Sequence, residues 1–204
     1  MAKLYFRYGA MNSGKSTALL QAAYNYQERG QRVLLTKPAV DTKGANLITS
    51  RLGVSTPVDF AIGPTDSARQ AFLTAAGAAP VACLLVDEAQ FLSPPQVNDL
   101  LRITVLDGIP VIAYGIRTDF RTEAFPGSRR LLEISHSLEE LKTICRCGRK
   151  AVFNGRVRNG HFVFDGDQVA IDAGPTAHED EVTYESLCAQ CYLRESGGVL
   201  DGKG

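Results

Sequence analysis

A glycine-rich segment near the beginning of the sequence has the composition of a loop that binds phosphates. Residues 9–16 match the pattern GxxxxGK[ST] and come between a predicted strand and a predicted helix. Backbone N–H groups of such a loop converge on an anion, and the helix N-terminus adds positive potential. Lys15 should reach the β- and γ-phosphates, and Ser16 should hold Mg²⁺ directly or through water. The alternative is an ordinary glycine-rich turn. The predicted phosphate site comprises Gly9, Ala10, Met11, Asn12, Ser13, Gly14, Lys15 and Ser16.

Two neighbouring acids follow an apolar run in the middle of the chain. Residues 81–86 read VACLLV and lead directly into Asp87-Glu88-Ala89-Gln90. An apolar strand that ends in an acid is typical of nucleotide sites, where the acid serves Mg²⁺. Successive strand residues point to opposite faces, so the two acids should have different roles. Asp87 is predicted to serve the metal and Glu88 to face a second substrate or a water; the alternative is a pair of solvated acids.

Four of the five cysteines form two close pairs. Cys145 and Cys147 are spaced as CxC, and Cys188 and Cys191 as CxxC. Four thiolates make a closed tetrahedral Zn²⁺ site of the structural type. Two pairs separated by a loop-rich span favour such a ribbon, and four ordinary reduced thiols or a redox pair are the alternatives. Cys83 lies inside an apolar run and is interpreted as a core residue.

Aromatic residues and histidines carry weaker signals. Phe91, Phe120, Phe125 and Tyr184 fall in predicted loops near the inferred site, where they could contact a planar ligand or belong to the core. The three histidines have no partner at metal or triad spacing and are interpreted as surface or structural residues. They are His136, His161 and His178.

Strand and helix patterns alternate along the first 125 or so positions, and these elements determine where the motifs lie in the fold. Strands are predicted at 3–8, 32–36, 81–86 and 110–114, and helices at 16–29, 66–76 and 94–106. The first helix should stop at Gly30, and Thr65 or Asp66 should cap the second. The order predicts a parallel sheet with helices on both faces, in which the phosphate loop and Asp87 share one edge.

The pattern changes after Phe125. Residues 128–141 resemble one helix, and short strands with turns follow from Cys145 onward. The turns are predicted at Asn154-Gly155, Asn159-Gly160 and Asp165-Gly166. A module of about 50 residues is too small to rely on its own apolar core, so it should need a metal. The expected domains are a nucleotide-binding domain at 1–142, a zinc-binding domain at 143–195 and a flexible tail at 196–204.

Composition excludes several classes of protein. The 204 residues are 45% hydrophobic, and 22 basic residues balance 22 acidic ones, which argues against global disorder and against a polyanion-binding coat. The basic stretch 142–160 is opposed by the acidic stretch 165–185, so no nucleic-acid partner is expected. No signal peptide is recognised, and the longest apolar run is shorter than the roughly 18 residues of a membrane helix. We expect a cytoplasmic protein with reduced cysteines and no membrane partner.

Four segments in this order resemble the type II thymidine kinases, the small tetrameric kind with a zinc-bearing domain. They are the phosphate loop with Met11, DEAQF at 87–91, YGIRTDF at 114–120 and the two cysteine pairs. The resemblance covers residues 3 to about 193. It implies a RecA-like P-loop fold and a zinc ribbon with a lasso loop that closes over the nucleoside.

The resemblance also implies individual roles. Glu88 is the expected general base on the thymidine 5′-hydroxyl, Asp87 serves Mg²⁺, and Gln90 joins the ATP site. Cys145, Cys147, Cys188 and Cys191 are the expected Zn²⁺ ligands. The expected nucleoside site comprises Met11, Arg51, Phe91, Phe120, Phe125, Val169, Ile171 and Tyr184. Feedback inhibition by dTTP and a homotetramer follow from the resemblance alone.

The sequence departs from the family pattern at two places. The lasso segment reads VAIDAG at 169–174 rather than VxIGG, and residues 175–182 look like an insertion before Tyr184. Lys43 stands where an arginine is usual, which weakens a bidentate phosphate contact there.

The expected activity is transfer of the γ-phosphoryl group of ATP to thymidine and deoxyuridine. Catalysis would depend on positioning and charge neutralisation around Lys15. The alternatives are a P-loop ATPase whose zinc ribbon holds nucleic acid, and a nucleotide-binding regulatory module without turnover.

Overall fold

The computed structural model of this protein describes residues 1–40, 46–168 and 182–200. It divides into two compact units. The first unit comprises Met1–Tyr8, Gly14–Arg117 and Phe125–Leu141. The second comprises Gly9–Ser13, Thr118–Ala124 and Lys142–Gly204.

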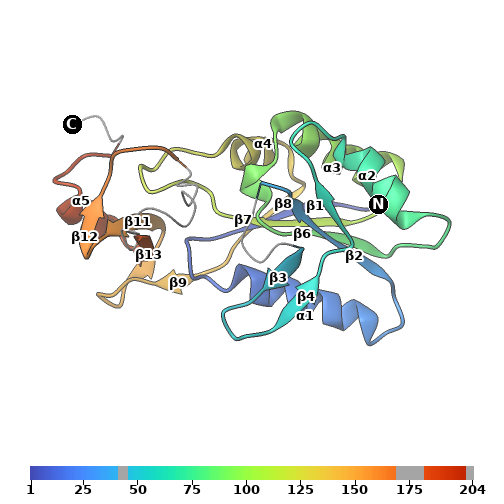
Figure 1. Ribbon diagram of the computed structural model, residues 1–204, viewed down its shortest axis with the longest axis horizontal. Coiled ribbons are helices and arrows are strands. Elements are labelled where there is room, and N and C mark those ends of the chain that lie inside the picture. The colour runs from blue at the N-terminus through green and yellow to red at the C-terminus, as the bar shows by residue number, and fades with distance from the viewer. Residues whose placement is uncertain (41–45, 169–181, 201–204) are drawn as a thin grey trace, which may run out of the picture. The chain divides into compact units, whose positions relative to one another are not determined.

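The first unit is built on a six-stranded sheet in the order β5-β2-β6-β7-β1-β8 (Figure 1). Its strands are β1 (Leu4–Tyr8), β2 (Val33–Pro38), β5 (Phe60–Ile62), β6 (Cys83–Val86), β7 (Val111–Gly115) and β8 (Ser137–Glu140). Every neighbouring pair is parallel. The predicted parallel α/β sheet is therefore confirmed.

Alternation along the strands divides the apolar residues between two faces of this sheet. Leu34, Leu84 and Val111 pack with α2 (Ala68–Ala76), α3 (Pro94–Leu106) and α4 (Pro126–Ile134). Their neighbours Leu35, Leu85 and Ile112 pack with α1 (Lys15–Gln27) and the β3-β4 hairpin (Leu47–Thr49, Ser55–Pro57). The helices accordingly lie on both sides of the sheet (Figure 1).

The helix ends follow local chemistry, with one difference from the sequence prediction. Helix α3 has the predicted bounds and a capping box between Ser93 and Gln96. The cap of α2 is Ser67, whose Oγ accepts a hydrogen bond from the Gln70 N–H at 3.2 Å. The prediction of Thr65 or Asp66 was wrong because Asp66 instead accepts a hydrogen bond from the Gly63 N–H at 2.8 Å.

The single helix predicted at 128–141 is wrong in its second half. Helix α4 ends at Ile134, and Ser137–Glu140 forms β8 along the free edge of β1. His136 joins the residues before β8 to the start of β1 through two hydrogen bonds. Its ring Nδ1 accepts from the Leu4 N–H at 3.0 Å, and its backbone N–H donates to the Leu4 carbonyl at 2.9 Å. Pairing with an exposed strand edge outweighs the helical pattern, and His136 has the predicted structural role.

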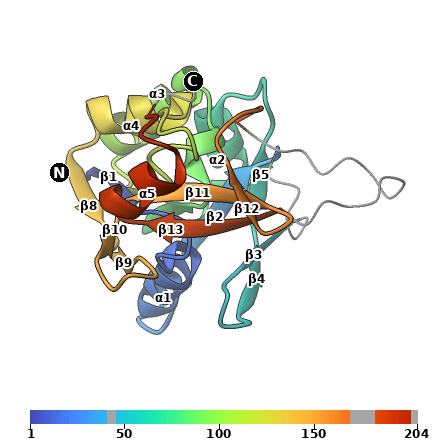
Figure 2. The same ribbon diagram turned by 90° about the vertical axis from the view of Figure 1, so that its left-hand side faces the viewer.

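The described part of the second unit contains two small antiparallel sheets and a short helix (Figure 2). They are β9-β10 (Thr143–Ile144, Lys150–Ala151), β12-β11-β13 (His161–Val163, Phe153–Arg158, Val182–Leu187) and α5 (Ala189–Glu195). Asn159 and Gly160 form the predicted hairpin turn, both with positive φ angles of 49° and 80°. The turn predicted at Asn154-Gly155 is wrong because both residues lie inside β11. Glycine is needed there for packing, since a Cβ at Gly155 would approach a Phe162 ring carbon at 2.6 Å.

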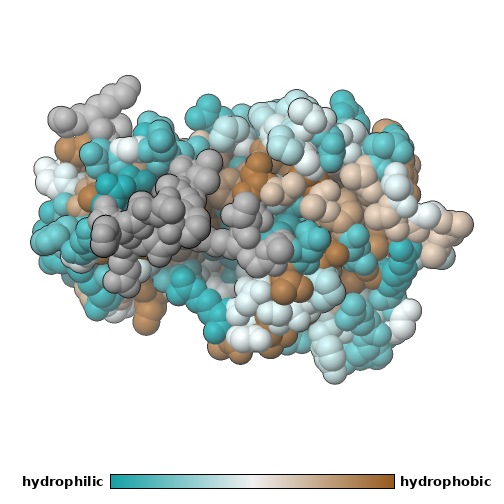
Figure 3. Space-filling view, in the orientation of Figure 1, coloured by the Kyte–Doolittle hydropathy of each residue, from teal (hydrophilic) through white to brown (hydrophobic). Residues whose placement is uncertain are grey.

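The surface carries apolar side chains in separate places. Figure 3 shows brown patches set among teal residues on the face that it displays. The most exposed large apolar residues in the described part of the chain include Leu52, Leu106, Val105 and Ile144. Within the described residues, no helix is long and apolar enough to cross a membrane.

Candidate active site

In the first unit, the start of α1 and the end of β6 bring a hydroxyl and a carboxylate together. Ser16 Oγ donates a hydrogen bond to Asp87 Oδ2 at 3.1 Å. Neighbouring oxygen ligands of an octahedral Mg²⁺ lie about 3 Å apart, because each lies 2.0–2.1 Å from the ion. The oxygen pair therefore fits the donor set predicted for Mg²⁺.

Burial controls the charge of Asp87. The side chain is 5% exposed, and its backbone N–H donates to the Thr36 carbonyl at 2.9 Å. Desolvation, and next the nearby Glu88 charge, raise the pKa of Asp87 to about 7. A nearby cation would stabilise the ionised form of such a buried carboxyl. This agrees with the prediction that Asp87 serves Mg²⁺.

Lys15 shares this environment. Burial lowers the pKa of the Lys15 ammonium, whereas the charges of Glu88 and Asp87 raise it. The charge of Arg51 also acts to lower this pKa, so Arg51 lies within electrostatic reach of Lys15. Arg51 is exposed in the turn between β3 and β4.

Glu88 is held in an uncommon backbone conformation next to Asp87. Its φ of 48° is in the left-handed region, which costs about 1 kcal/mol or more for a residue with a Cβ. Strand β6 ends at Val86, so the expectation that the acids alternate on a strand was wrong. Glu88 instead adopts the left-handed conformation directly after the strand, and its carboxylate lies within electrostatic reach of Asp87.

Gln90 orients the Glu88 carboxylate. Gln90 is 2% exposed, its Oε1 accepts a hydrogen bond from the Ile116 N–H at 3.2 Å, and its Nε2 donates to Glu88 Oε2. The partners fix which end of the amide is which, because an N–H can only donate. The sequence prediction placed Gln90 with ATP and did not anticipate this contact.

The phosphate loop has the backbone of an anion nest. Asn12 and Gly14 have positive φ angles of 66° and 76°, separated by Ser13, and alternation of this kind makes successive N–H groups converge. Within the second unit, the Ser13 N–H donates to the Ala10 carbonyl at 3.3 Å. Met11 contacts Asn154 and Ser186, two residues that the sequence prediction did not identify.

The predicted aromatic residues have different environments. Phe91 and Phe125 make an edge contact with ring centroids 5.6 Å apart. Phe120 is buried under the Arg156 guanidinium, 3.8 Å from the ring centroid. Tyr184 lies in strand β13, so its prediction as a loop residue was wrong. Val169, Ile171, Lys43 and positions 175–181 lie outside the described residues, whereas Val182 begins β13.

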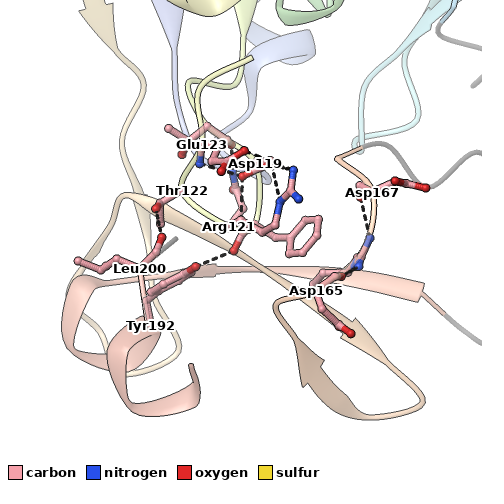
Figure 4. A network of polar contacts seen from close by, with 12 residues as sticks. Asp119, Arg121, Thr122, Glu123, Asp165, Asp167, Tyr192 and Leu200 are labelled. Carbon is pink, nitrogen blue, oxygen red and sulfur yellow. Dashed lines mark hydrogen bonds and ion pairs between the residues drawn. The ribbon is translucent and has the colours of Figure 1, made fainter. Parts of the chain in front are cut away.

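The loop at 118–124 is internally braced in the second unit (Figure 4). Asp119 is 3% exposed and accepts hydrogen bonds from the N–H groups of Arg121 and Glu123 at 2.8 and 2.9 Å. The Tyr192 hydroxyl donates to the Phe120 carbonyl at 2.7 Å, and Thr122 Oγ1 donates to the Leu200 carbonyl (Figure 4). Helix α5 and the residues after it thus hold this loop from one side.

The two cysteine pairs converge as predicted. The sulfur atoms of Cys145, Cys147, Cys188 and Cys191 all lie within 4.8 Å of one another. Tetrahedral Zn–S bonds of 2.3 Å require sulfur separations of about 3.8 Å, and Cys147 Sγ and Cys188 Sγ are 3.6 Å apart. The Cys191 N–H hydrogen bond lowers the pKa of Cys188 to about 6. The cluster fits a structural Zn²⁺, whereas Cys83 is buried in the core with its pKa raised to about 12 by burial.

Comparison with known proteins agrees with this geometry. A family model described as thymidine kinase matches residues 2–192. A thymidine kinase of Legionella pneumophila (strain Lens) is 48% identical over 209 residues, covering 99% of this chain and 95% of that protein. Those of Ruegeria pomeroyi and Chromobacterium violaceum are each 44% identical, covering 100% and 94% of this chain and 100% and 98% of theirs. The chain therefore belongs to the thymidine kinase family.

Proposed function

We propose that this protein transfers the γ-phosphoryl group of ATP to the 5′-hydroxyl of thymidine, giving dTMP and ADP. Membership of the thymidine kinase family supports a nucleoside kinase. The observation that carries the chemistry is the contact of Ser16 with Asp87, with Lys15 and Glu88 beside it. Deoxyuridine, which lacks only the thymine methyl group, is the second proposed substrate.

Glu88 acts as the general base. The nucleoside hydroxyl has a pKa far above neutrality, so the carboxylate receives its proton late, as the bond to phosphorus forms. The Gln90 amide holds one carboxylate oxygen, which leaves the other for the substrate. The two neighbouring carboxylates have different partners, because Glu88 accepts from Gln90 and Asp87 accepts from Ser16.

Ser16 and Asp87 would hold Mg²⁺, and Lys15 and the loop N–H groups would hold the phosphates. When bound, the metal neutralises charge on the phosphoryl oxygens. In the second unit, the four clustered cysteines would hold a Zn²⁺ that stabilises the fold around them.

The nucleoside site is proposed from the family resemblance, together with two aromatic residues, Phe120 and Phe125, that the sequence places near the inferred site. It comprises Met11, Arg51, Phe91, Phe120, Phe125, Val169, Ile171 and Tyr184. We further propose a nucleotide-binding domain at 1–142, a zinc and lasso domain at 143–195 and a tail at 196–204. A homotetramer, a cytoplasmic location and inhibition by dTTP complete the proposal.

A panel of nucleosides tests this function. Purified protein with ATP and Mg²⁺ should convert thymidine and deoxyuridine to monophosphates, and should convert cytidine and adenosine much more slowly. The alternative, an ATPase acting on nucleic acid, predicts ATP hydrolysis that needs DNA and no nucleoside. The family match favours the nucleoside kinase, and DNA-dependent hydrolysis without monophosphate formation would reject it.

A further inference from the structure

One residue of the phosphate loop has both of its backbone polar groups bound by side chains of the second unit. Asn154 Oδ1 accepts a hydrogen bond from the Met11 N–H at 2.7 Å. Ser186 Oγ donates a hydrogen bond to the Met11 carbonyl. Asn154 and Ser186 are opposite one another on strands β11 and β13. One cross-strand pair of side chains therefore hydrogen-bonds both the N–H and the carbonyl of Met11.

Asn154 has no unused polar atom in this arrangement. It is 3% exposed, and its Nδ2 donates a hydrogen bond to the Thr118 carbonyl at 2.8 Å. An aspartate would lack the donor for Thr118, and a leucine would lack both groups. The side chain thus ties the phosphate loop to the 118–124 loop and requires an amide of this length.

A third hydrogen bond binds the backbone of the next residue, Asn12. Thr143 Oγ1, on β9, donates to the Asn12 carbonyl at 3.4 Å. An anion nest requires N–H groups that converge on one side, so the carbonyls of the same residues must turn to the other side. Ser186 and Thr143 supply donors for two successive carbonyls, which stabilises the backbone turn that a nest needs.

We propose that Asn154 and Ser186 are positioning residues for the phosphate loop, which they hold ready for the triphosphate before ATP binds. A loop that is already ordered pays less conformational entropy on binding. The inference rests on the proposed function, because ATP is taken as the ligand of this loop. In this arrangement the Met11 N–H is engaged by Asn154, so we infer that Met11 contributes to the phosphate loop through its backbone position and not through its N–H.

The test measures the affinity for β,γ-methylene ATP, which is not hydrolysed, without any nucleoside. Ser186→Ala removes the donor to Met11, and we expect the dissociation constant to rise about threefold to tenfold, as for the loss of one hydrogen bond. Ser186→Thr keeps the hydroxyl and should bind more tightly than Ser186→Ala. Thr183→Ala, on the same strand but exposed, is the matched control and should bind like wild type.

Asn154→Leu removes two hydrogen bonds at once and should weaken the analogue more than Ser186→Ala does. If Asn154→Leu does not fold, the serine series decides. A dissociation constant within twofold of wild type for folded Ser186→Ala would overturn the proposal, as would equal weakening by Thr183→Ala. Wild-type turnover of thymidine is measured separately. A protein that makes no dTMP but loses analogue affinity on Ser186→Ala would refute the kinase proposal and leave the positioning role intact.

Discussion

The first unit and the second unit reach ordered structures by different means. The first buries apolar residues on both faces of a six-stranded parallel sheet. Among its described residues, the second has a small cluster around Leu187 and Tyr192, in which three of the six buried members are cysteines. A core of that size stabilises little, so we expect the second unit to need a metal at its four cysteines, whereas the first is stabilised by packing.

Removing the metal should have the largest effect, and it should act on the second unit alone. Structural Zn²⁺ contributes about 10 kcal/mol or more to small metal domains. We expect a chelator, or Cys188→Ser, to expose β11 and β13 to amide hydrogen exchange while β6 and β7 stay protected. Exchange followed by mass spectrometry measures both regions in one sample.

The control for zinc removal is Cys83→Ala, which removes a thiol outside the cluster. It should leave the zinc content at about one ion per chain, with the four-cysteine site filled. Native protein without zinc, or unchanged protection of β11 and β13 after chelation, would contradict the dependence of the second unit on metal.

Loss of the proposed base should act on turnover and leave both units folded. Glu88→Gln is nearly isosteric but cannot accept the proton, so kcat should fall roughly 10² to 10⁴-fold. Affinity for an ATP analogue should stay within about twofold, because Lys15 and the loop N–H groups remain. Glu28→Gln, on the exposed end of α1, serves as control. A Glu88→Gln enzyme that keeps half its turnover would remove Glu88 from the mechanism.

The difference between the units also explains what the sequence could predict. Patterns within the parallel sheet placed β1, β6, β7 and α3 closely, because buried runs and caps are local signals. The sequence prediction missed strand β8 because residues 137–140 become a strand by pairing with β1, a distant segment that their own pattern does not reveal. Asn154 was interpreted as a turn residue because Asn-Gly usually marks one, whereas the packing of Gly155 against Phe162 is a long-range requirement.

Inhibition by dTTP should depend on the phosphate loop and on the nucleoside site together. A ligand with the base of one substrate and the phosphates of the other gains both sets of contacts at the ordering cost of one molecule. We expect dTTP to compete with thymidine. Lys15→Ala should weaken dTTP about tenfold or more, as for a lost hydrogen bond to a charged group, and should weaken thymidine less.

Initial rates at varied thymidine and dTTP give the inhibition constants. CTP is the comparison ligand, since it carries the same phosphates on a different base. Equal inhibition by CTP and dTTP would show that the base is not recognised, and the proposed nucleoside site would have to be abandoned.

The smallest expected effect is that of removing the cap at the start of α2 in the first unit. Ser67 Oγ accepts from the Gln70 N–H and donates to Asp99 Oδ2 at 2.7 Å, which ties α2 to a buried carboxylate on α3. Ser67→Ala removes both contacts and should lower the free energy of unfolding by about 1 kcal/mol. Thr65→Ala, at the cap position that the sequence suggested, should change it by less than about 0.5 kcal/mol, since exposed substitutions of this kind are nearly neutral. Urea unfolding of the zinc-loaded protein measures both, and a larger loss for Thr65→Ala would mean that α2 begins earlier than Ala68. Because both substitutions lie in the first unit, neither should change the zinc content, and that invariance separates a local cap effect from loss of the second unit.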